Sequence, residues 1–415
     1  SRALSSPHPV LPLFIFDPTI LDLLKRPFDR RVEFIHQTIQ GLHKQLRARG
    51  SGLLVRIGRP VEIFRSLMEE YTVDTVYANE DYEPYAVQRD IEVAGFLAER
   101  GSTLQLSKDQ VIRAKDEVLT GSGTPFRVFT PYRNKWRDML QVADLRPFAT
   151  TTEFSRFAPV SAEVPSLETL GFQATAAPFP EYTLSGETLR QYAHQRDVPS
   201  AEATSHLGIH LRFGTVSIRE VVEQVAAGSD VLLSELVWRE FFMMILHHHP
   251  HVVHRCFRPE FEAIQWRNNK EEFRLWCEGR TGYPLVDAGM RQLNETGYMH
   301  NRVRMITASF LIKDLLIDWR WGEAYFASKL LDYELASNNG NWQWVAGTGC
   351  DAAPYFRVFH PETQRKKFDP RDIYCRRWIP ELGTPDYPEP LVFHAEARQR
   401  ALHAYKAALL KAYHG

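Results

Sequence analysis

The sequence LASNNGNWQW at residues 335–344, which runs on through GTGCDAAPYFR at 347–357, decides the fold of this chain. Its three asparagines and two tryptophans place amide groups beside large aromatic surfaces, a combination suited to binding a flat polar heterocycle. We expect a turn interrupted by Gly340. Taken alone, the stretch could equally be a polar turn whose Trp pair packs in a core. The flanking motifs favour the binding site.

Three flanking motifs follow one another along the chain, TGYPLVDAGMRQL at 281–293, GYMHNRVRMITAS at 297–309 and KDLLIDWR at 313–320. With the central stretch they resemble the flavin-binding domain of the photolyase and cryptochrome family, over about residues 192–378. The Met-His-Asn-Arg form at 299–302 is similar to class I cyclobutane pyrimidine dimer photolyases, whereas (6-4) enzymes and animal cryptochromes carry a His-containing variant and cryptochrome DASH a Ser-Asn-Arg one. The resemblance implies a light-driven DNA repair flavoprotein, a carbon–carbon lyase.

The composition is that of an ordinary globular protein, with 44% hydrophobic and 24% charged residues in 415 and a formal net charge of -1. Any DNA binding must therefore come from a local basic face. Four cysteines without paired spacing indicate reduced thiols. The apolar Val10–Phe16 is interrupted by Pro12 and closed by Asp17, which predicts a strand and neither a signal nor a membrane segment. We expect a cytoplasmic monomer.

The first part of the chain alternates strand-like and helix-like runs. Strands are expected at 10–16, 53–57, 73–78 and 103–106, with helices at 35–50, 60–71 and 86–99 between them. This order predicts a doubly wound parallel α/β sheet. The family opens with one further strand that carries a Trp-Phe-Arg-Arg-Asp-Leu-Arg signature. Because Ser1 is not an initiator Met, we expect N-terminal residues to be missing from this sequence, and without that strand the sheet would lack a central member.

Three regions are predicted. Residues 1–125 would form the α/β domain of the antenna type, 126–185 a proline-rich inter-domain connection without periodicity, and 186–415 an all-helical FAD-binding catalytic domain. Within the FAD-binding domain, helices are expected at 217–228, 233–246, 287–297 and 299–319, with Asp287 as an N-cap.

Two other motifs are set aside. GTGCDA at 347–352 matches a dinucleotide fingerprint, but no hydrophobic strand of a βαβ unit precedes it. The run HHHPHVVH at 247–254 would bind zinc only with a third ligand for a helical i, i+4 pair, and histidines at a helix end are favoured by the dipole alone. We predict no metal site.

The resemblance implies the FAD contacts. Hydroxyls and backbone amides that suit a diphosphate come from Tyr192, Thr204, Ser205, Leu207 and Gly208. A Ser/Thr turn that caps a helix is the alternative. His206 and Gly208 stand where the family often has Arg and Ser.

Further contacts follow from the same resemblance. Arg239 would face the phosphates, Asp332 would pair with Arg304 beside the isoalloxazine, and Asn338 would face its N5. Glu334 replaces a common Asp and so has a longer reach. A second antenna chromophore, a folate, a deazaflavin or a second flavin, is expected in the α/β domain.

The catalytic and DNA-binding residues are also implied by the resemblance. Glu235, Trp238, Asn301, Met305 and Trp344 would form the substrate pocket, although a solvated ion pair between Glu235 and Arg239 beside a core Trp is the alternative. An electron-transfer chain would run through Trp342, Trp319 and Trp266, which could instead be ordinary core residues. DNA phosphates would contact Arg196, Arg302 and Arg357.

We therefore predict an enzyme that splits cyclobutane pyrimidine dimers in DNA by electron transfer from photoexcited reduced FAD. A cryptochrome-like blue-light photoreceptor that signals through a protein partner is the first alternative. A helical flavin-binding module without DNA affinity is the second. When the lesion enters a pocket walled by Trp238, Met305 and Trp344, Glu235 should lose hydration, which raises the pKa of its carboxyl. Glu235 could then donate a hydrogen bond to a pyrimidine carbonyl.

Overall fold

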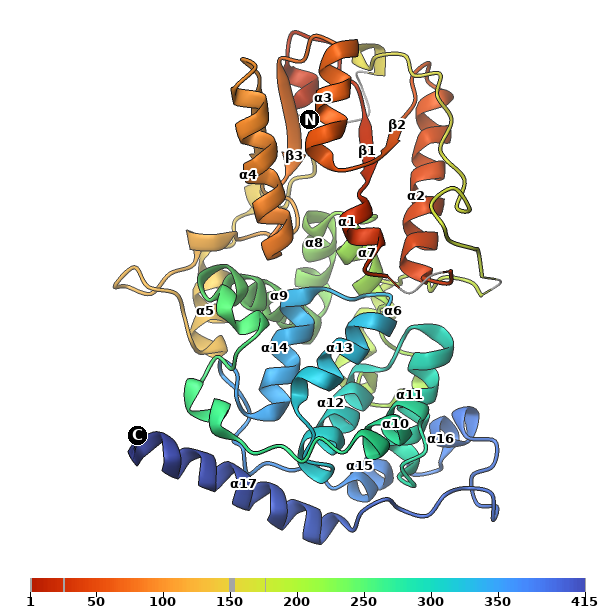
Figure 1. Ribbon diagram of the computed structural model, residues 1–415, viewed down its shortest axis with the longest axis vertical. Coiled ribbons are helices and arrows are strands. Elements are labelled where there is room, and N and C mark those ends of the chain that lie inside the picture. The colour runs from red at the N-terminus through yellow and green to blue at the C-terminus, as the bar shows by residue number, and fades with distance from the viewer. Residues whose placement is uncertain (1, 25–26, 149–153, 176, 415) are drawn as a thin grey trace. The chain divides into compact units, whose positions relative to one another are not determined.

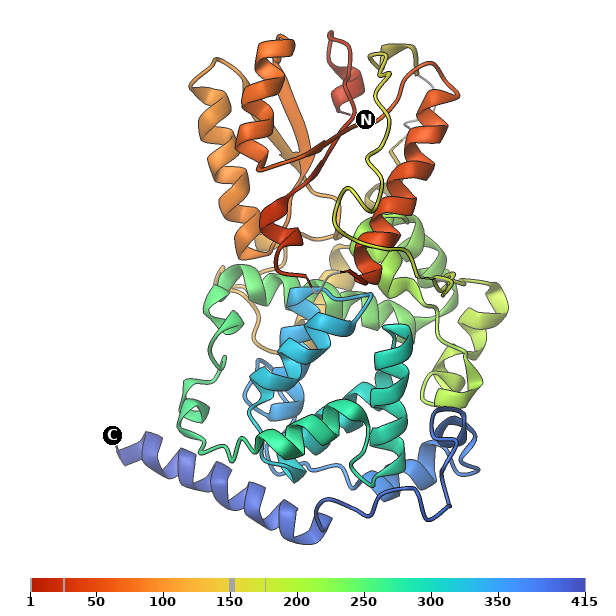
Figure 2. The same cartoon turned by 45° about the vertical axis from the view of Figure 1, so that its right-hand side comes forward.

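The computed structural model describes residues 2–24, 27–148, 154–175 and 177–414 (Figures 1 and 2). The chain divides into two compact units, each made of three segments. The first unit comprises Ser1–Ile112, Gln141–Glu181 and Phe213–Val221, and the second Arg113–Leu140, Tyr182–Arg212 and Val222–Gly415. Among the helices within the described ranges, none has both the length and the apolar character that crossing a bilayer would need.

The first unit carries the strands β1 (Leu13–Phe16), β2 (Leu54–Ile57), β3 (Thr75–Asn79) and β4 (Thr103–Ser107). They pair in parallel, as the alternating order predicts, with Leu13 opposite Leu54 and Thr75 opposite Thr103. Within the described ranges they form two separate two-stranded sheets, β1 with β2 and β3 with β4.

Helices cover both faces of these strands, namely α1 (Pro18–Leu21), α2 (Arg30–Arg47), α3 (Pro60–Glu70) and α4 (Pro84–Ala98). Neighbouring residues of β2 point to opposite sides, because side chains alternate along a strand. Leu54 packs in a buried cluster with α3 and α4, whereas Val55 packs in a second cluster with α2. The predicted doubly wound α/β class is therefore confirmed.

The second unit is helical, as predicted. The helices that lie wholly within it are α5 (Phe129–Met139), α6 (Gly186–Gln195), α9 (Asp230–His248), α10 (Lys270–Glu278), α11 (Pro284–Thr296), α12 (Asn301–Ser309), α13 (Trp319–Lys329), α14 (Leu335–Ala346), α15 (Pro361–Phe368), α16 (Ile373–Trp378) and α17 (His394–His414). Two more, α7 (Leu207–Phe213) and α8 (Ile218–Gly228), continue into segments of the first unit. The stretch 126–185 was expected to lack periodic structure, but it contains α5, while 149–153 and 176 lie outside the described residues.

Helices α12, α13 and α14 lie side by side (Figures 1 and 2). Their inner residues share one buried cluster with α11, which includes Leu293, Val303, Phe310 and Trp342. Gly289 makes the approach of α11 to α12 possible, because a Cβ there would meet Val303 Cγ1 at 2.4 Å. This core supports the side chains described below.

The central stretch is helical, so the prediction of a turn at 335–344 is wrong. Gly340 does not interrupt α14. It allows α9 to pack closely, because a Cβ at this position would meet Phe242 Cδ1 at 2.2 Å. Helical geometry places Asn338 and Trp342 on the same face, four residues apart.

Two smaller predictions also need correction. The expected helix at 299–319 is broken: α12 ends at Ser309, a π-helical turn follows at Phe310–Asp314, and Leu316 has a φ of 50° before α13 begins. Asp287 is not an N-cap, because α11 begins at Pro284. Its carboxylate lies in the first turn and accepts from the backbone N–H groups of Thr281 and Gly282.

Candidate functional site

One pocket in the helical unit gathers many of the predicted residues. Its walls come from two helical faces with the spacing i, i+3, i+4 and i+7. Those faces are Asn301, Arg304, Met305 and Ala308 on α12, and Asn338, Asn341, Trp342 and Val345 on α14. Between and beside them lie Phe326, Leu330, Asp332, Tyr333, Glu334 and Ser337.

The predicted pair of Arg304 and Asp332 is present at this pocket. Two hydrogen bonds join them, with Arg304 Nη2 at 2.9 Å from Asp332 Oδ2 and Nη1 at 3.1 Å from Oδ1. Burial lowers the pKa of the Arg304 guanidinium, but the charge and hydrogen bonds of Asp332 outweigh it, so the pKa is raised. Gly208 lies against this pair, since a Cβ there would meet Asp332 Cβ at 2.8 Å. The departure from the family's Ser at 208 thus matches a close backbone approach.

A second pair joins α9 to the start of α14. Arg239 Nη2 lies 2.8 Å from Glu334 Oε1, and the hydroxyl of Ser337 donates to the other carboxylate oxygen. The longer Glu334 side chain therefore reaches an arginine that the sequence placed against the cofactor phosphates. Both side chains are largely buried, so this pair fixes α9 to the pocket wall at the start of α14.

Asn338 has a partner that the sequence did not reveal. Its Nδ2 donates to Glu323 Oε1 at 2.8 Å and to the backbone oxygen of Glu323 at 3.1 Å. Burial raises the pKa of Glu323, and the hydrogen bond from Asn338 partly opposes this. Because the amide NH₂ is directed to Glu323, the acceptor end of Asn338 is the end oriented away from it. No local spacing signals this contact, since Glu323 lies on α13.

Glu235 lies in a separate polar cluster with α6. The hydroxyl of Tyr192 donates to one of its carboxylate oxygens, and the guanidinium of Arg196 pairs with the other. Burial raises the pKa of Glu235, while Arg196 and Tyr192 lower it, and the net direction is upward. The raised pKa has the direction expected from the sequence, and burial is its largest cause.

Arg302 also has an acidic partner in this structure. Its Nη2 and Nε lie 2.8 and 3.2 Å from Asp197 Oδ1, and its guanidinium is 4.7 Å from the ring centre of Phe368. Arg357 is exposed. Two of the three arginines predicted to contact DNA thus pair with carboxylates.

The remaining aromatic residues of the predicted set lie outside the pocket lining. Trp238 stacks on Phe129 of α5, with ring centres 3.7 Å apart and planes at 10°. Trp344 is partly buried against the main core, Trp319 is 1% exposed, and Trp266 packs edge-on to a tyrosine of α17. These positions are those of residues that pack in or against the core.

The phosphate-segment residues have local partners. Thr204 Oγ1 lies 3.0 Å from the hydroxyl of Tyr298, and Ser205 and Leu207 are buried. His300, the N-cap of α12, accepts from the backbone N–H of Arg302 at 3.2 Å. Burial lowers the pKa of His300 to about 4. His300 is thus a neutral cap for the helix that supplies half of the pocket.

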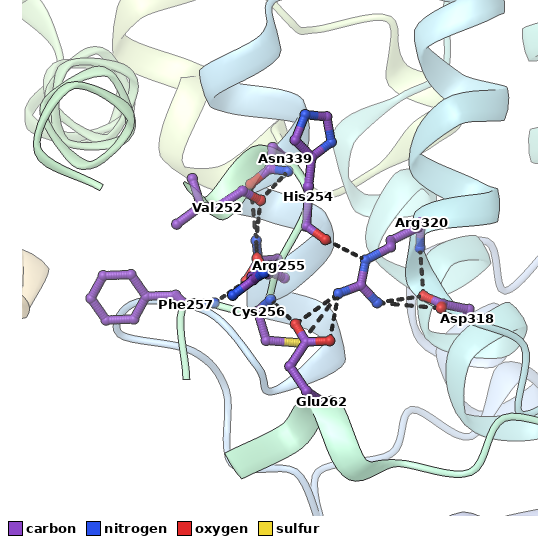
Figure 3. A network of polar contacts seen from close by, with 10 residues as sticks. Val252, His254, Arg255, Cys256, Phe257, Glu262, Asp318, Arg320 and Asn339 are labelled. Atoms are coloured by element: carbon purple, nitrogen blue, oxygen red, sulfur yellow. Dashed lines mark hydrogen bonds and ion pairs between the residues drawn. The ribbon is translucent and has the colours of Figure 1, made fainter. Parts of the chain in front are cut away.

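A polar network holds the back of α14 (Figure 3). The amides of Asn339 and Gln343 donate to the backbone oxygen of Val252 at 3.0 and 2.9 Å. The segment that contains Val252 also contacts Arg320. Arg320 donates to the backbone oxygen of His254 and forms an ion pair with Glu262 at 2.8 Å. The amide side chains of α14 therefore have two roles. Asn339 and Gln343 anchor the helix, whereas Asn338 and Asn341 face the pocket.

Comparison with known proteins finds matches along most of the chain. Residues 1–152 match the family described as DNA photolyase, and residues 232–386 match the FAD binding domain of DNA photolyase. The deoxyribodipyrimidine photo-lyase of Escherichia coli (strain K12) is 39% identical, over 91% of this chain and 89% of that protein.

Two solved structures have the same fold. An archaeal photolyase from Sulfolobus tokodaii with two FAD molecules has a TM-score of 0.86 and 35% identity, over 98% of this chain and 95% of that one. A cryptochrome from Synechocystis sp. PCC6803 has a TM-score of 0.85 and 26% identity, over 97% of this chain and 95% of that one. Both types of protein that the sequence suggested are thus represented among its relatives.

Proposed function

The chain belongs to the DNA photolyase family, and we propose that it uses light and FAD to split cyclobutane pyrimidine dimers in DNA. The observation that carries this proposal is that seven residues expected from the family resemblance line one pocket. They are Asn301, Arg304, Met305, Asp332, Glu334, Asn338 and Trp342.

The pocket fits the flavin portion of FAD by its chemistry. Trp342 and Phe326 offer flat apolar surfaces, and Asn338 offers an oriented amide whose acceptor end is not taken by Glu323. Arg304 and Arg239 offer positive charge that Asp332 and Glu334 hold in position. When bound, FAD would supply an excited reduced ring that gives an electron to the dimer and recovers it afterwards.

The protein's own work would be to bind and polarise the dimer. A damaged base is cheaper to extrude from the duplex than an intact one, since its stacking and pairing are already weakened. Glu235, with its raised pKa, would donate a hydrogen bond to a pyrimidine carbonyl as that oxygen becomes more negative. Asn301 and Met305 would contribute one polar and one apolar contact, and Arg196, Arg302 and Arg357 would hold phosphates.

Several finer points belong to the same proposal. We propose a monomer that works in the cytoplasm; the four free cysteines support a reducing compartment. We propose a second chromophore as an antenna in the α/β domain, as the two FAD molecules of the Sulfolobus tokodaii photolyase suggest. We also propose domain limits at 125 and 186, between which lies the proline-rich connection.

A cryptochrome-like photoreceptor is the second candidate, favoured by the likeness to the Synechocystis protein. A salt-dependent binding assay on duplexes with and without one thymine dimer separates the candidates. The photolyase proposal predicts tighter binding to the damaged duplex, with a similar salt slope for both. A photoreceptor without repair activity should bind both duplexes equally, and a flavin module without DNA affinity should bind neither.

A further inference from the structure

The fold brings Asp116, a possible third metal ligand, next to the histidines at the end of α9. From the sequence we expected no metal there, because histidines at the end of a helix are favoured by the dipole alone. The 3₁₀ turn Lys115–Glu117 brings Asp116 to the last turn of α9, beside His247 and His248. One ligand atom from each of these three side chains lies within 4.8 Å of the other two.

The closest two ligand atoms already have the spacing of a shared ion. His248 Nε2 lies 3.4 Å from Asp116 Oδ1. Two ligands at 2.0–2.2 Å from one tetrahedral zinc ion are separated by about 3.3–3.6 Å. The same Nε2 is buried and makes no aligned hydrogen bond to any described residue. A buried imidazole nitrogen at this distance from a carboxylate suits a cation between them.

The donor set selects the kind of ion. Two imidazoles and one carboxylate suit Zn²⁺, Co²⁺ or Ni²⁺, whereas Mg²⁺ and Ca²⁺ prefer oxygen ligands alone. Asp116 and His247 are exposed, so an ion can enter from solvent and keep water in its remaining position. The nearby Glu117 is 3.9 Å from Arg113, so Asp116 is the carboxylate that faces the imidazoles.

We propose that Asp116, His247 and His248 bind one divalent transition-metal ion. The ion would tie the 115–117 turn to the C-terminal end of α9, whose middle carries Trp238 and Arg239. Because the site lies outside the pocket lining, its role is to stabilise the helical unit. This role does not depend on the proposed repair activity.

The test is calorimetric titration of the chelator-treated, FAD-containing full chain with zinc chloride. We expect one equivalent of zinc per chain, and a rise in the unfolding midpoint when zinc is added. Asp116→Asn and His248→Gln should each weaken zinc binding by roughly tenfold or more, because each removes a direct ligand. His251→Gln is the matched control, since His251 belongs to the same run, is exposed and lies outside the cluster.

Folding of the variants is checked without zinc, by their FAD content and unfolding midpoint, which should equal those of the parent. Loss of zinc binding in the control to the same extent as in Asp116→Asn would overturn the proposal, since the ion would then bind the histidine run nonspecifically. Absence of a stoichiometric site in the parent would overturn it as well.

Discussion

The arginine–carboxylate pairs at the pocket and those around Glu235 differ in how deeply they are buried. Side chains of the pocket pairs, Arg304–Asp332 and Arg239–Glu334, are 6–23% exposed. Those of the outer pairs, Arg196–Glu235 and Arg302–Asp197, are 17–40% exposed. A buried pair is costly to break by removing one partner, whereas an exposed pair contributes little. The pocket pairs are therefore suited to a permanent architecture, and the outer pairs to exchange with DNA phosphates.

Removing one partner of a pocket pair should have the largest effect. Asp332→Ala leaves the guanidinium of Arg304 buried without its carboxylate, which should cost about 3–5 kcal/mol of unfolding free energy. We also expect loss of most bound FAD. Denaturant unfolding and the FAD-to-protein ratio measure both effects.

Asp197→Ala is the matched control among the outer pairs. It removes an exposed carboxylate, so the cost should be about 1 kcal/mol or less, with normal FAD content. Equal destabilisation by the two substitutions would remove the distinction drawn between the pairs.

The cap of α12 links the two sets, because that helix carries both Arg304 and Arg302. The pKa of His300 is lowered to about 4, below the value of about 6.5 expected in the unfolded chain. The folded state thus resists protonation, so this contribution to stability is complete above pH 6.5 and is lost as the pH falls toward 4. The loss should be about 3 kcal/mol at most.

Unfolding of the parent and of His300→Asn across pH 4–7 checks this expectation. Asn retains the capping function but does not titrate in this range. The variant should therefore lose less stability on acidification than the parent, and parallel curves would exclude His300 as the cause.

Substitution of Glu235 should change the yield of dimer splitting and leave the free energy of unfolding nearly unchanged. Glu235→Ala removes a donor to the pyrimidine carbonyl and should lower the yield of dimer splitting per absorbed photon roughly tenfold or more. Glu235→Gln keeps a donor and should repair better than the Ala variant. Both variants should still prefer damaged DNA. Parental yield in the Ala variant would show that Glu235 does not act on the dimer.

Whether a site residue could be predicted depends on how far apart in the sequence its contacts lie. Asn301, Arg304 and Met305 of α12 and Asn338 and Trp342 of α14 could be named in advance, because they belong to family motifs that are local in the sequence. The helix that carries Asn338 and Trp342 was not predicted. The partners Glu334 for Arg239 and Glu323 for Asn338 come from other helices, so spacing could not reveal them.

Gly340 illustrates the reverse error. From the sequence its conformational freedom indicated a turn, but the missing side chain serves the packing of Phe242 against α14. Local propensity was overridden by a tertiary contact. The proximity of Asp116 to the histidines of α9 was also not predicted, because the 3₁₀ turn that carries Asp116 is remote from α9 in sequence.

The outer arginines should show the smallest effect. Arg302→Gln removes one phosphate contact, so the slope of log affinity for DNA against log salt should become shallower by about 0.9. Arg274→Gln is the control, because Arg274 is an exposed arginine of α10 that pairs with Glu271 and Glu278. An unchanged slope for Arg302→Gln would show that Arg302 does not contact a DNA phosphate and that its pairing with Asp197 is only structural.

Light-dependent splitting of a thymine dimer in a defined duplex tests the central claim most directly. The FAD-containing protein, chemically reduced, is incubated with the duplex in the dark and under blue light, and the remaining dimer is measured by chromatography. We predict that the dimer is restored to two thymines under light alone, and that Asp332→Ala protein without FAD restores none. Persistence of the dimer under light in flavin-loaded parent protein, or repair of (6-4) photoproducts instead, would contradict the account.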